Sequence, residues 1–438
     1  MQKSNQTNGK YTTVDILKFI LCSIVGIFMF FVSIPYQGKS SIPLDHVVTI
    51  IKTALGGAVK YYGLIILIIG AILPFKNKTW NKTKVDIVFS IFKVIGAITG
   101  IMYVFNLGPE FLYAPDIFPF LYEKLVLPLG LLIPVGAVFL SFLVGYGLME
   151  FTGVLMQPVM RPIWKTPGRS AIDAVASFVG SYSLGLLITN RVYLEGKYTT
   201  KEAVIIATGF STVSATFMII VAKTLGLMEM WNLYFWTTLV ITFIVTAITV
   251  RIYPINKKPD NYVSDNPDPE VIVTTKRLST AWNEALKTSH NSESILANVL
   301  SNLKDGLKMI CNILPTIMSI GLLGLLLATY TPIFDVLGYI FYPFTRLMQI
   351  PDAMLTAKAL SVGITEMFLP AGIVANAALL SRYVVGVTCV SSVLFFSASI
   401  PCMLSTEIPV TIPELVIIWF ERSVLSVILA ALFGFIIF

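Results

Sequence analysis

The segment "SVGITEMFLP" (361–370) places one carboxylate, Glu366, within an otherwise apolar part of the chain. Gly363 and Pro370 lie on either side of it, and both residue types interrupt helices. The ends of an interrupted helix carry unpaired main-chain groups and partial charges. A carboxylate beside such ends can bind a cation or the donor groups of a polar solute. We therefore interpret Thr365 and Glu366 as candidate ligands.

A structural role for Glu366 is the alternative. Its carboxylate could form an ion pair with the nearest base on either side, Lys358 or Arg382. Because a charge within an apolar segment is costly and is usually kept for a role, we favour a functional site.

Further hydroxyl groups could complete the site. Residues 208–212 and 388–392 repeat a spacing of i, i+3 and i+4, which places three side chains on one face of a helix. Small polar residues on such a face either line a site or allow close helix packing. The residues are Thr208, Ser211 and Thr212 in the first stretch, and Thr388, Ser391 and Ser392 in the second.

The stretch "GSYSLG" (180–185) is a second interruption, at which Gly180 and Gly185 allow a turn. Unlike "GITE" in the other stretch, it contains no carboxylate. The candidate ligands in or beside it are Ser181, Tyr182, Ser183 and Asn190.

The elements that position these residues lie in a membrane. The chain has 438 residues, of which 56% are hydrophobic and 13% charged, with a mean hydropathy of +0.81. A soluble domain carries about 25% charged residues, so too little polar surface remains to cover a globule in water. Apolar runs of about 18 residues or more recur along the chain. The sequence therefore predicts an all-α polytopic membrane protein.

We predict nine membrane-spanning helices, the first of which is retained and not cleaved as a signal peptide. Lys-rich flanks before the first helix and in the loop 76–84 place both on the cytoplasmic side, whereas the acidic loop 106–124 lies outside. Alternation then places the C-terminus outside. The predicted spans are about 16–36, 58–75, 85–105, 125–147, 202–225, 233–253, 308–330, 384–404 and 414–438.

Two more apolar stretches, about 170–190 and 353–380, are interrupted in the middle. Each half has about ten residues, or about 15 Å of helix, which is half the thickness of a bilayer core. Such a segment turns back inside the membrane, and its tip must face a wet or solute-filled cavity. We predict two re-entrant helical hairpins.

The two halves of the chain repeat each other. "GVLMQPVMRPIWKTP" (153–167) matches "GYIFYPFTRLMQIP" (338–351), and in each half an interrupted stretch and the hydroxyl pattern follow. Each unit has one span, an interfacial stretch, a hairpin and two more spans. Because three crossings are an odd number, the second unit is inverted relative to the first. Inverted repeats with broken helices are typical of secondary transporters, which bind solute near the midplane.

We predict four regions, which are an N-terminal three-helix region (1–124), a first repeat (125–253), a cytoplasmic linker with an amphipathic helix (254–305) and a second repeat (306–438). The linker begins with a polar, proline-containing stretch that we expect to be mobile. The net charge of +7 indicates Lys and Arg in cytoplasmic loops and no nucleic-acid partner.

The sequence indicates neither an enzyme nor a metal site. It contains no nucleotide-binding glycine loop, zinc motif or nucleophile–base arrangement, and its four cysteines lack metal-ligand spacing. Glu407, Glu414 and the adjacent pair Glu421 and Arg422 are interpreted as interfacial or paired residues and not as ligands.

The segments "ASFVGSYSLGLLITNR", "KEAVIIATGFSTVSATFM" and "SVGITEMFLPAGIV" resemble nucleoside-recognition, or Gate, domain proteins, most of all YjiH-type bacterial membrane proteins. The likeness extends over nearly the whole chain and is strongest over 125–438. Gate domains also occur in concentrative nucleoside transporters, ferrous-iron transporters and spore maturation membrane proteins. The resemblance implies a bacterial cytoplasmic membrane protein whose hairpins hold a solute and a coupling cation.

We expect a secondary transporter of a small polar solute that works by alternating access. The resemblance implies nucleosides or bases, and amino acids or small peptides remain alternatives. No cofactor is expected beyond a coupling Na+ or H+. The expected partners are the lipid bilayer, the solute, and a second copy of the chain or a second Gate-domain subunit. The rival hypothesis is a non-transporting membrane scaffold, as the spore maturation proteins suggest.

Overall fold

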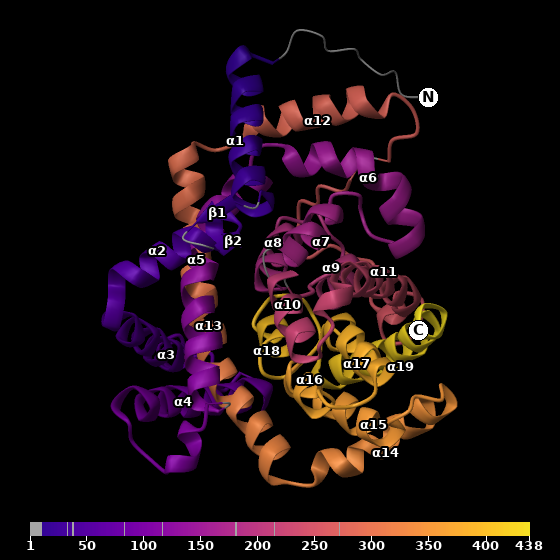
Figure 1. Ribbon diagram of the computed structural model, residues 1–438. Helices are drawn as coiled ribbons and strands as arrows, with labels where there is room; N and C mark the ends of the chain where they lie inside the picture. Colours follow the sequence, from indigo (N-terminus) through magenta and orange to yellow (C-terminus); the bar gives the residue numbers. More distant parts are fainter. Residues whose placement is uncertain are drawn as a thin grey trace.

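The computed structural model describes residues 11–438 except 33, 37–38, 83, 116, 180–181, 214 and 271. Helices make up most of this part of the chain (Figure 1). Its strands form one short antiparallel pair, β1 (Ile34–Tyr36) with β2 (Lys39–Ser41). The predicted all-α fold is confirmed.

Seven helices of the described part are long and apolar enough to cross a membrane, so the protein is a multi-pass membrane protein. A shorter helix, α2 (Pro43–Leu55), leads into the second of them, and a π-helical segment (Phe120–Val126) leads into the fourth. The seven are α1 (Thr13–Phe31), α3 (Val59–Lys76), α4 (Lys84–Phe105), α5 (Leu127–Val144), α11 (Trp231–Thr249), α13 (Ile295–Tyr330) and α19 (Ile412–Ile437).

The longest helix, α13, has 36 residues, and α3, α4 and α5 pack against it. Gly70 of α3 allows this contact, because a Cβ at that position would lie 1.9 Å from the carbonyl oxygen of Cys311. Small residues let helices approach closely in a membrane. The N-terminal helices are thereby joined to the first helix of the second unit.

Seven of the nine predicted spans correspond to long helices, and each of the other two consists of two shorter helices separated by a break. Hydropathy does not register these breaks, because the residues in them are small, hydroxylated or apolar. In the second break, the N–H of Leu394 donates to the carbonyl of Ser392 at 2.7 Å, and Val393 has a φ of +65°, so the chain leaves the helical path. The range 202–225 forms α9 (Thr200–Gly209) and α10 (Ala215–Thr224), and the range 384–404 forms α17 (Leu379–Ser391) and α18 (Ser399–Leu404).

Each predicted hairpin segment consists of two short helices. The first contains α7 (Ser170–Val179) and α8 (Tyr182–Leu194), and the second contains α15 (Ala353–Val362) and α16 (Leu369–Ile373). Gly180 and Ser181, which were predicted to form the first tip, lie outside the described residues. The second arm of the second hairpin has five residues and not about ten.

Two residues that were predicted to interrupt helices do not do so. Gly185 lies inside α8, where a Cβ would come within 1.7 Å of the Ser177 hydroxyl oxygen, so it allows the two arms to pack closely. Pro370 is the second residue of α16 and begins that helix, because its missing N–H costs nothing in a first turn. Gly363 does follow α15 directly, as its C-cap.

The helices from α5 to α11 and from α13 to α19 follow the same order. Each set has a long helix, an amphipathic helix, a hairpin, a broken helix and a second long helix. The amphipathic helices are α6 (Leu148–Trp164) and α14 (Ile333–Leu347). Figure 1 shows α6 near the top of the molecule and α14 at the bottom. Opposite ends are the positions expected in an inverted pair.

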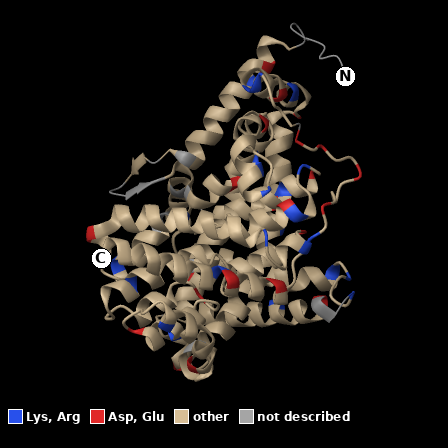
Figure 2. Ribbon diagram, turned by 90° about the vertical axis from the view of Figure 1, so that its right-hand side faces the viewer, with Lys and Arg blue, Asp and Glu red and all other residues tan. Residues whose placement is uncertain are grey.

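The linker between the units contacts the first unit through Glu270. Figure 2 shows charged residues along it, whereas the long helices are mostly free of charge. Glu270 is buried, and its carboxylate accepts hydrogen bonds from the N–H groups of Gly168 at 3.1 Å and Arg169 at 3.2 Å. Arg161 pairs with the same carboxylate at 3.0 Å.

The predicted amphipathic helix of the linker is shorter than expected. It is α12 (Arg277–Asn291), which packs against α1 and α6. The chain turns after Asn291, and Ser294 caps the next helix by accepting a hydrogen bond from the N–H of Ala297 at 3.3 Å. The last part of the predicted linker therefore already belongs to α13.

Candidate functional site

Glu366 lies at the interruption between α15 and α16 and is 2% exposed. Its Oε2 accepts hydrogen bonds from the N–H groups of Phe368 at 2.6 Å and Leu369 at 3.1 Å. The carboxylate therefore caps the first turn of α16, where the unpaired N–H groups attract a negative charge.

The alternative ion pairs of Glu366 are not found. Lys358 pairs with Asp335, and Arg382 donates to the carbonyl oxygen of Leu225 at 2.7 Å. Among the described residues, no Lys, Arg or His side chain pairs with Glu366. A buried carboxylate that lacks a cation is costly, which is the usual sign of a functional group in a membrane.

The tip that carries Glu366 is bonded to the break between α17 and α18. The N–H of Phe396 donates to the carbonyl of Ile364 at 2.6 Å, and the N–H of Ser397 donates to that of Thr365 at 2.7 Å. The two interruptions thus satisfy part of each other's main chain, as backbone within a membrane requires. The hydroxyl of Thr365 donates to the carbonyl of Val362 at 2.7 Å and closes the turn.

A cavity of about 10 Å³ lies beside this tip, and four predicted residues line it. This volume holds about one water-sized particle. The cavity is therefore too small for a nucleoside or an amino acid in this conformation. The lining includes Gly363, Pro370, Thr388 and Ser392, together with Trp419 and Ser423.

The candidate ligands of the first hairpin are separated from one another. Tyr182 begins α8, and its ring lies edge-on to Phe395 in the second unit, with ring centroids 5.7 Å apart. Ser183 is fully buried beside it. Asn190 lies two turns further along α8, where its Oδ1 accepts a hydrogen bond from the N–H of Glu407 at 2.9 Å. Asn190 therefore does not belong to the tip.

Asn190 and Glu407 instead line a cavity of about 320 Å³ between the two units. Helices α5, α8 and α13 and residues 405–407 form its walls. Its volume lies within the range of small-molecule sites. Glu407 was predicted to be interfacial, whereas Glu414 does pair, with Lys258 at 2.8 Å.

The predicted hydroxyl faces mostly bond to their own helices. The hydroxyls of Thr208, Thr388 and Ser391 donate to the carbonyls four residues earlier at 2.7–2.9 Å. Such bonds are common in helices and leave the hydroxyl oxygen able to accept another bond. The hydroxyls of Ser211 and Thr212, which follow α9, are buried and have no partner in the described part of the chain.

Arg422 was interpreted as interfacial or paired, and the structure corrects this. It is the eleventh residue of α19, about 15 Å from the start of the helix, and it is 0% exposed. Its Nε donates to the carbonyl of Ser391 and its Nη1 to the hydroxyl of Thr246, both at 3.0 Å. Its Nη2 has no partner among the described residues, and Glu421 does not pair with it. The sequence interpretation missed it, although its depth within the apolar run 412–437 was an available signal.

Asp173 is a second residue that the sequence interpretation missed. It lies on α7 and is 1% exposed, and its carboxyl oxygens lie within hydrogen-bond distance of the hydroxyls of Thr189 at 2.8 Å and Tyr198 at 2.6 Å. A carboxylate in the apolar run "SAIDAVASFV" was the available signal.

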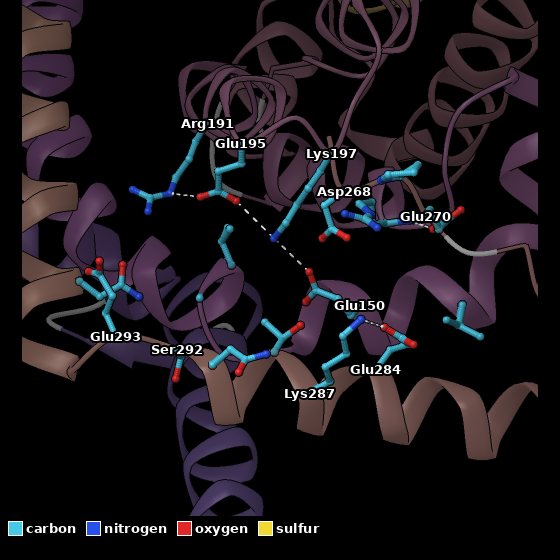
Figure 3. A pocket seen from close by; sticks show the side chains of 18 of the residues that line it. Glu150, Arg191, Glu195, Lys197, Asp268, Glu270, Glu284, Lys287, Ser292 and Glu293 are labelled. Carbon is cyan, nitrogen blue, oxygen red and sulfur yellow. Dashed lines mark hydrogen bonds and ion pairs between the residues drawn. The ribbon is translucent and has the colours of Figure 1, made fainter. Parts of the chain in front are cut away.

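A charged cavity of about 420 Å³ lies where α6, α8, α12, α13 and the linker meet (Figure 3). Lys197 lies between two carboxylates in it, 3.1 Å from Glu150 and 3.2 Å from Glu195. Burial raises the pKa of Glu150, but the charges of Lys197 and Arg169 outweigh burial and hold the pKa below its ordinary value. Burial lowers the pKa of Lys197, and the two carboxylates more than offset this and raise it. The pair therefore stays ionised and connects the end of the first hairpin to α6.

Comparison with known proteins relates this fold to one family. A family model described as "Gate: Nucleoside recognition" matches residues 126–228. An uncharacterised protein of Alkalihalophilus pseudofirmus is 32% identical over 445 residues, which cover 95% of this chain and 93% of that protein. Two variants of CNTnw in an outward-facing state are similar in structure, with TM-scores of 0.47 and 0.36 at 12% and 13% identity. These alignments cover 94% and 96% of this chain and 99% and 96% of those chains. The chain belongs to the same family as the Alkalihalophilus pseudofirmus protein, and its residues 126–228 form a region that matches the nucleoside-recognition, or Gate, model.

Proposed function

We propose that the protein is a secondary transporter of a small polar solute and that Glu366 binds the solute or a coupling cation. The observation that carries the proposal is the buried carboxylate at a helix interruption, without a cationic partner in the described part of the chain. A bound cation or a solute donor group would supply the missing partner. Na+ and H+ are the two cations that such a group takes most simply.

We propose that the solute passes through the cavity of about 320 Å³ between the units. Asn190 and Glu407 at its wall provide hydrogen-bonding groups from both units. Alternating access then requires the tip cavity beside Gly363 to widen. The segments that would move are α16 and the break at 392–398, because both are short and the break is bonded to Ile364 and Thr365 in the tip that precedes α16.

Two observations bear on the solute. The description of the matching family model, nucleoside recognition, favours nucleosides or bases. The buried guanidinium of Arg422, whose Nη2 is unpaired, favours a solute with an anionic group, such as an amino acid or a small peptide. The first class is the proposed solute, and the second is its alternative.

We infer the orientation and partners from charge and architecture. The Lys-rich flanks place the N-terminus in the cytoplasm and the C-terminus outside, in a bacterial cytoplasmic membrane. Each broken helix counts as one crossing in this assignment. A second copy of the chain or a second Gate-domain subunit remains the proposed protein partner.

One observation favours the alternative function, a membrane scaffold that transports nothing. The cavity at the second tip has a volume of about 10 Å³, which accommodates no solute. In a scaffold, Glu366 would serve only as the cap of α16.

The test is a thermal-shift screen of the purified protein against nucleosides, amino acids and dipeptides, with sodium and pH varied, followed by uptake into proteoliposomes. A transported solute should raise the melting temperature, because it binds the folded state alone. It should then accumulate in vesicles that contain the protein. Absence of both effects for every solute class would support the scaffold.

A further inference from the structure

Asp173 lies against a threonine hydroxyl that also contacts a main-chain carbonyl. The hydroxyl oxygen of Thr189 lies 2.8 Å from Asp173 Oδ1 and also 2.8 Å from the carbonyl oxygen of Gly185. A threonine hydroxyl has a single proton, so it can donate fully to only one of these two oxygens. The second contact becomes a full hydrogen bond only if another group supplies a proton.

The bond to Gly185 uses the proton of Thr189. Gly185 lies four residues before Thr189 on α8, and a threonine hydroxyl in a helix ordinarily donates to that carbonyl. The contact between Thr189 and Asp173 is then an attraction only if the carboxyl group carries a proton and donates it. On its other oxygen, Asp173 accepts the proton of Tyr198 at 2.6 Å.

No cation forms an ion pair with Asp173 in the described part of the chain. Arg169, which immediately precedes α7 and is buried, acts on Asp173 through its charge but does not pair with it among the described residues. Thr189 and Tyr198 are fully buried and neutral. An ionised carboxylate in this position would be costly, and protonation removes that cost.

The charged groups on the elements that pack against α7 are bound elsewhere. These elements are α1, α6, α8 and α9, to which the linker adds Glu270. Four of them form ion pairs with acidic or basic side chains: Asp15 with His290, Glu150 with Lys197, Arg161 with Glu270, and Arg191 with Glu195. The other three bind main-chain groups: Lys18 the carbonyls of residues 292 and 293, Lys201 the carbonyl of Asn256, and Glu202 the N–H of Thr199.

Asp352 provides a contrast within the same chain. Its Oδ2 accepts bonds from the N–H of Ala378 at 2.8 Å and from the hydroxyl of Ser381 at 3.0 Å. In the described contacts, neither of these two donors is also within hydrogen-bond distance of a carbonyl oxygen. These contacts require no proton on the carboxyl group, and this makes Asp352 a matched control.

We propose that Asp173 is a proton-binding site in the first hairpin, distinct from Glu366. The carboxylate takes up one proton, the new O–H donates to Thr189, Thr189 donates to Gly185, and no other bond changes. Exchange with water runs through the charged cavity, because Arg169 lines that cavity and Lys197 precedes Tyr198 in the chain. The site does not depend on the proposed transport.

Infrared difference spectroscopy of the purified protein at neutral pH tests this site without a transport assay. The substitution Asp173→Asn preserves the pattern, because the amide nitrogen donates to Thr189 and the amide oxygen accepts from Tyr198. The wild-type spectrum should show one carboxylic acid C=O band that is lost in Asp173→Asn. The same band should remain in Asp352→Asn and in Glu366→Gln. Loss of a carboxylate band instead, with no loss of an acid band, would overturn the proposal.

A second variant decides the matter if Asp173→Asn does not fold. Thr189→Val removes the acceptor of the carboxyl proton and keeps the volume of the side chain. The acid band should then move to higher frequency, because its O–H is no longer hydrogen-bonded. A shift of a carboxylate band in this variant, with the acid region unchanged, would show that Asp173 is ionised.

Discussion

The ring of Tyr182, at the start of α8, lies edge-on to the ring of Phe395, in the break between α17 and α18, with centroids 5.7 Å apart and an interplanar angle of 79°. The two residues belong to different units. Ile364 and Thr365, at the tip of the second hairpin, are bonded to the neighbouring residues of the same break. The break at 392–398 is therefore the place where both hairpins meet.

This contact predicts energetic coupling between the units. Edge-to-face pairs contribute about 1 kcal/mol beyond their buried area. A double-mutant cycle of Tyr182→Leu and Phe395→Leu, measured by denaturant unfolding in detergent, should give a coupling free energy of about this size. Tyr182→Leu combined with Phe75→Leu, whose ring stacks on Trp80 in the N-terminal region, should be additive. Additivity in the first pair would mean that the first hairpin does not contact the break at 392–398.

Gly185→Ala should destabilise the protein by about 1–3 kcal/mol, the usual cost of overpacking. The added methyl group would come within 1.7 Å of the Ser177 hydroxyl oxygen and push the arms of the first hairpin apart. Adding Ser177→Ala should recover part of the loss. Gly372→Ala in α16 is the control, because no atom lies within 4 Å of the added Cβ, and it should have little effect. Equal melting temperatures for both glycine variants would contradict the close crossing of α7 and α8.

Local signals in the sequence were enough to predict the hairpins and the order of the elements. Gly363 and Thr365 mark the interruption at 363–368, and this feature depends on only a few neighbouring residues. The adjacency of Thr388 and Ser392 to Gly363 followed from the same repeat, because each hairpin is followed by the same hydroxyl pattern.

The remaining errors have a common physical cause. Hydropathy counts side chains and does not register where the main chain leaves a helix, so the breaks after Gly209 and Ser391 were read as continuous spans. Contacts between residues that are distant in the sequence could not be predicted either. Asp173 depends on Tyr198, and Arg422 depends on Thr246 in the other unit, and only the folded chain brings these residues together.

The ion pair of Glu150 and Lys197 predicts a pH range of stability. The pKa of Glu150 is lowered, so its contribution is present above the unfolded value of about 4.3 and is lost as the pH falls through the folded value. The pKa of Lys197 is raised, so its contribution is full below about 10.4 and is lost as the pH rises through the folded value. The melting temperature should therefore be nearly constant between these limits and fall outside them.

Lys197→Met should lower the stability by about 3 kcal/mol or more at neutral pH, because it leaves Glu150 buried without a cation. The double variant with Glu150→Gln should regain much of this loss. If Lys197→Met alone left the free energy of unfolding unchanged, the pair would not be buried as described.

Arg422→Met should leave the melting temperature unchanged or raise it, because replacing a buried charge that lacks a carboxylate by an apolar chain removes a desolvation cost. If Arg422 contacts the solute, uptake should fall about tenfold or more, the loss expected for a hydrogen bond to a charged group. Arg251→Met is the control, because that side chain also donates to carbonyls, of Pro162 and Ile163, but is exposed. A stability loss of several kcal/mol with normal uptake would assign Arg422 to the fold alone.

The charge of Glu366 can be separated from its role as a cap, because a glutamine oxygen can still accept the N–H bonds of Phe368 and Leu369. Glu202→Gln is the matched control, since Glu202 also caps a helix, by accepting from the N–H of Thr199 at 2.9 Å. The direct measurement is uptake of the solute identified in the binding screen, by proteoliposomes that contain each variant, with the cation gradient imposed or absent. Glu366→Gln should keep its melting temperature and lose uptake about tenfold or more, while Glu202→Gln should transport normally. Normal, cation-dependent uptake by Glu366→Gln would contradict the proposed site.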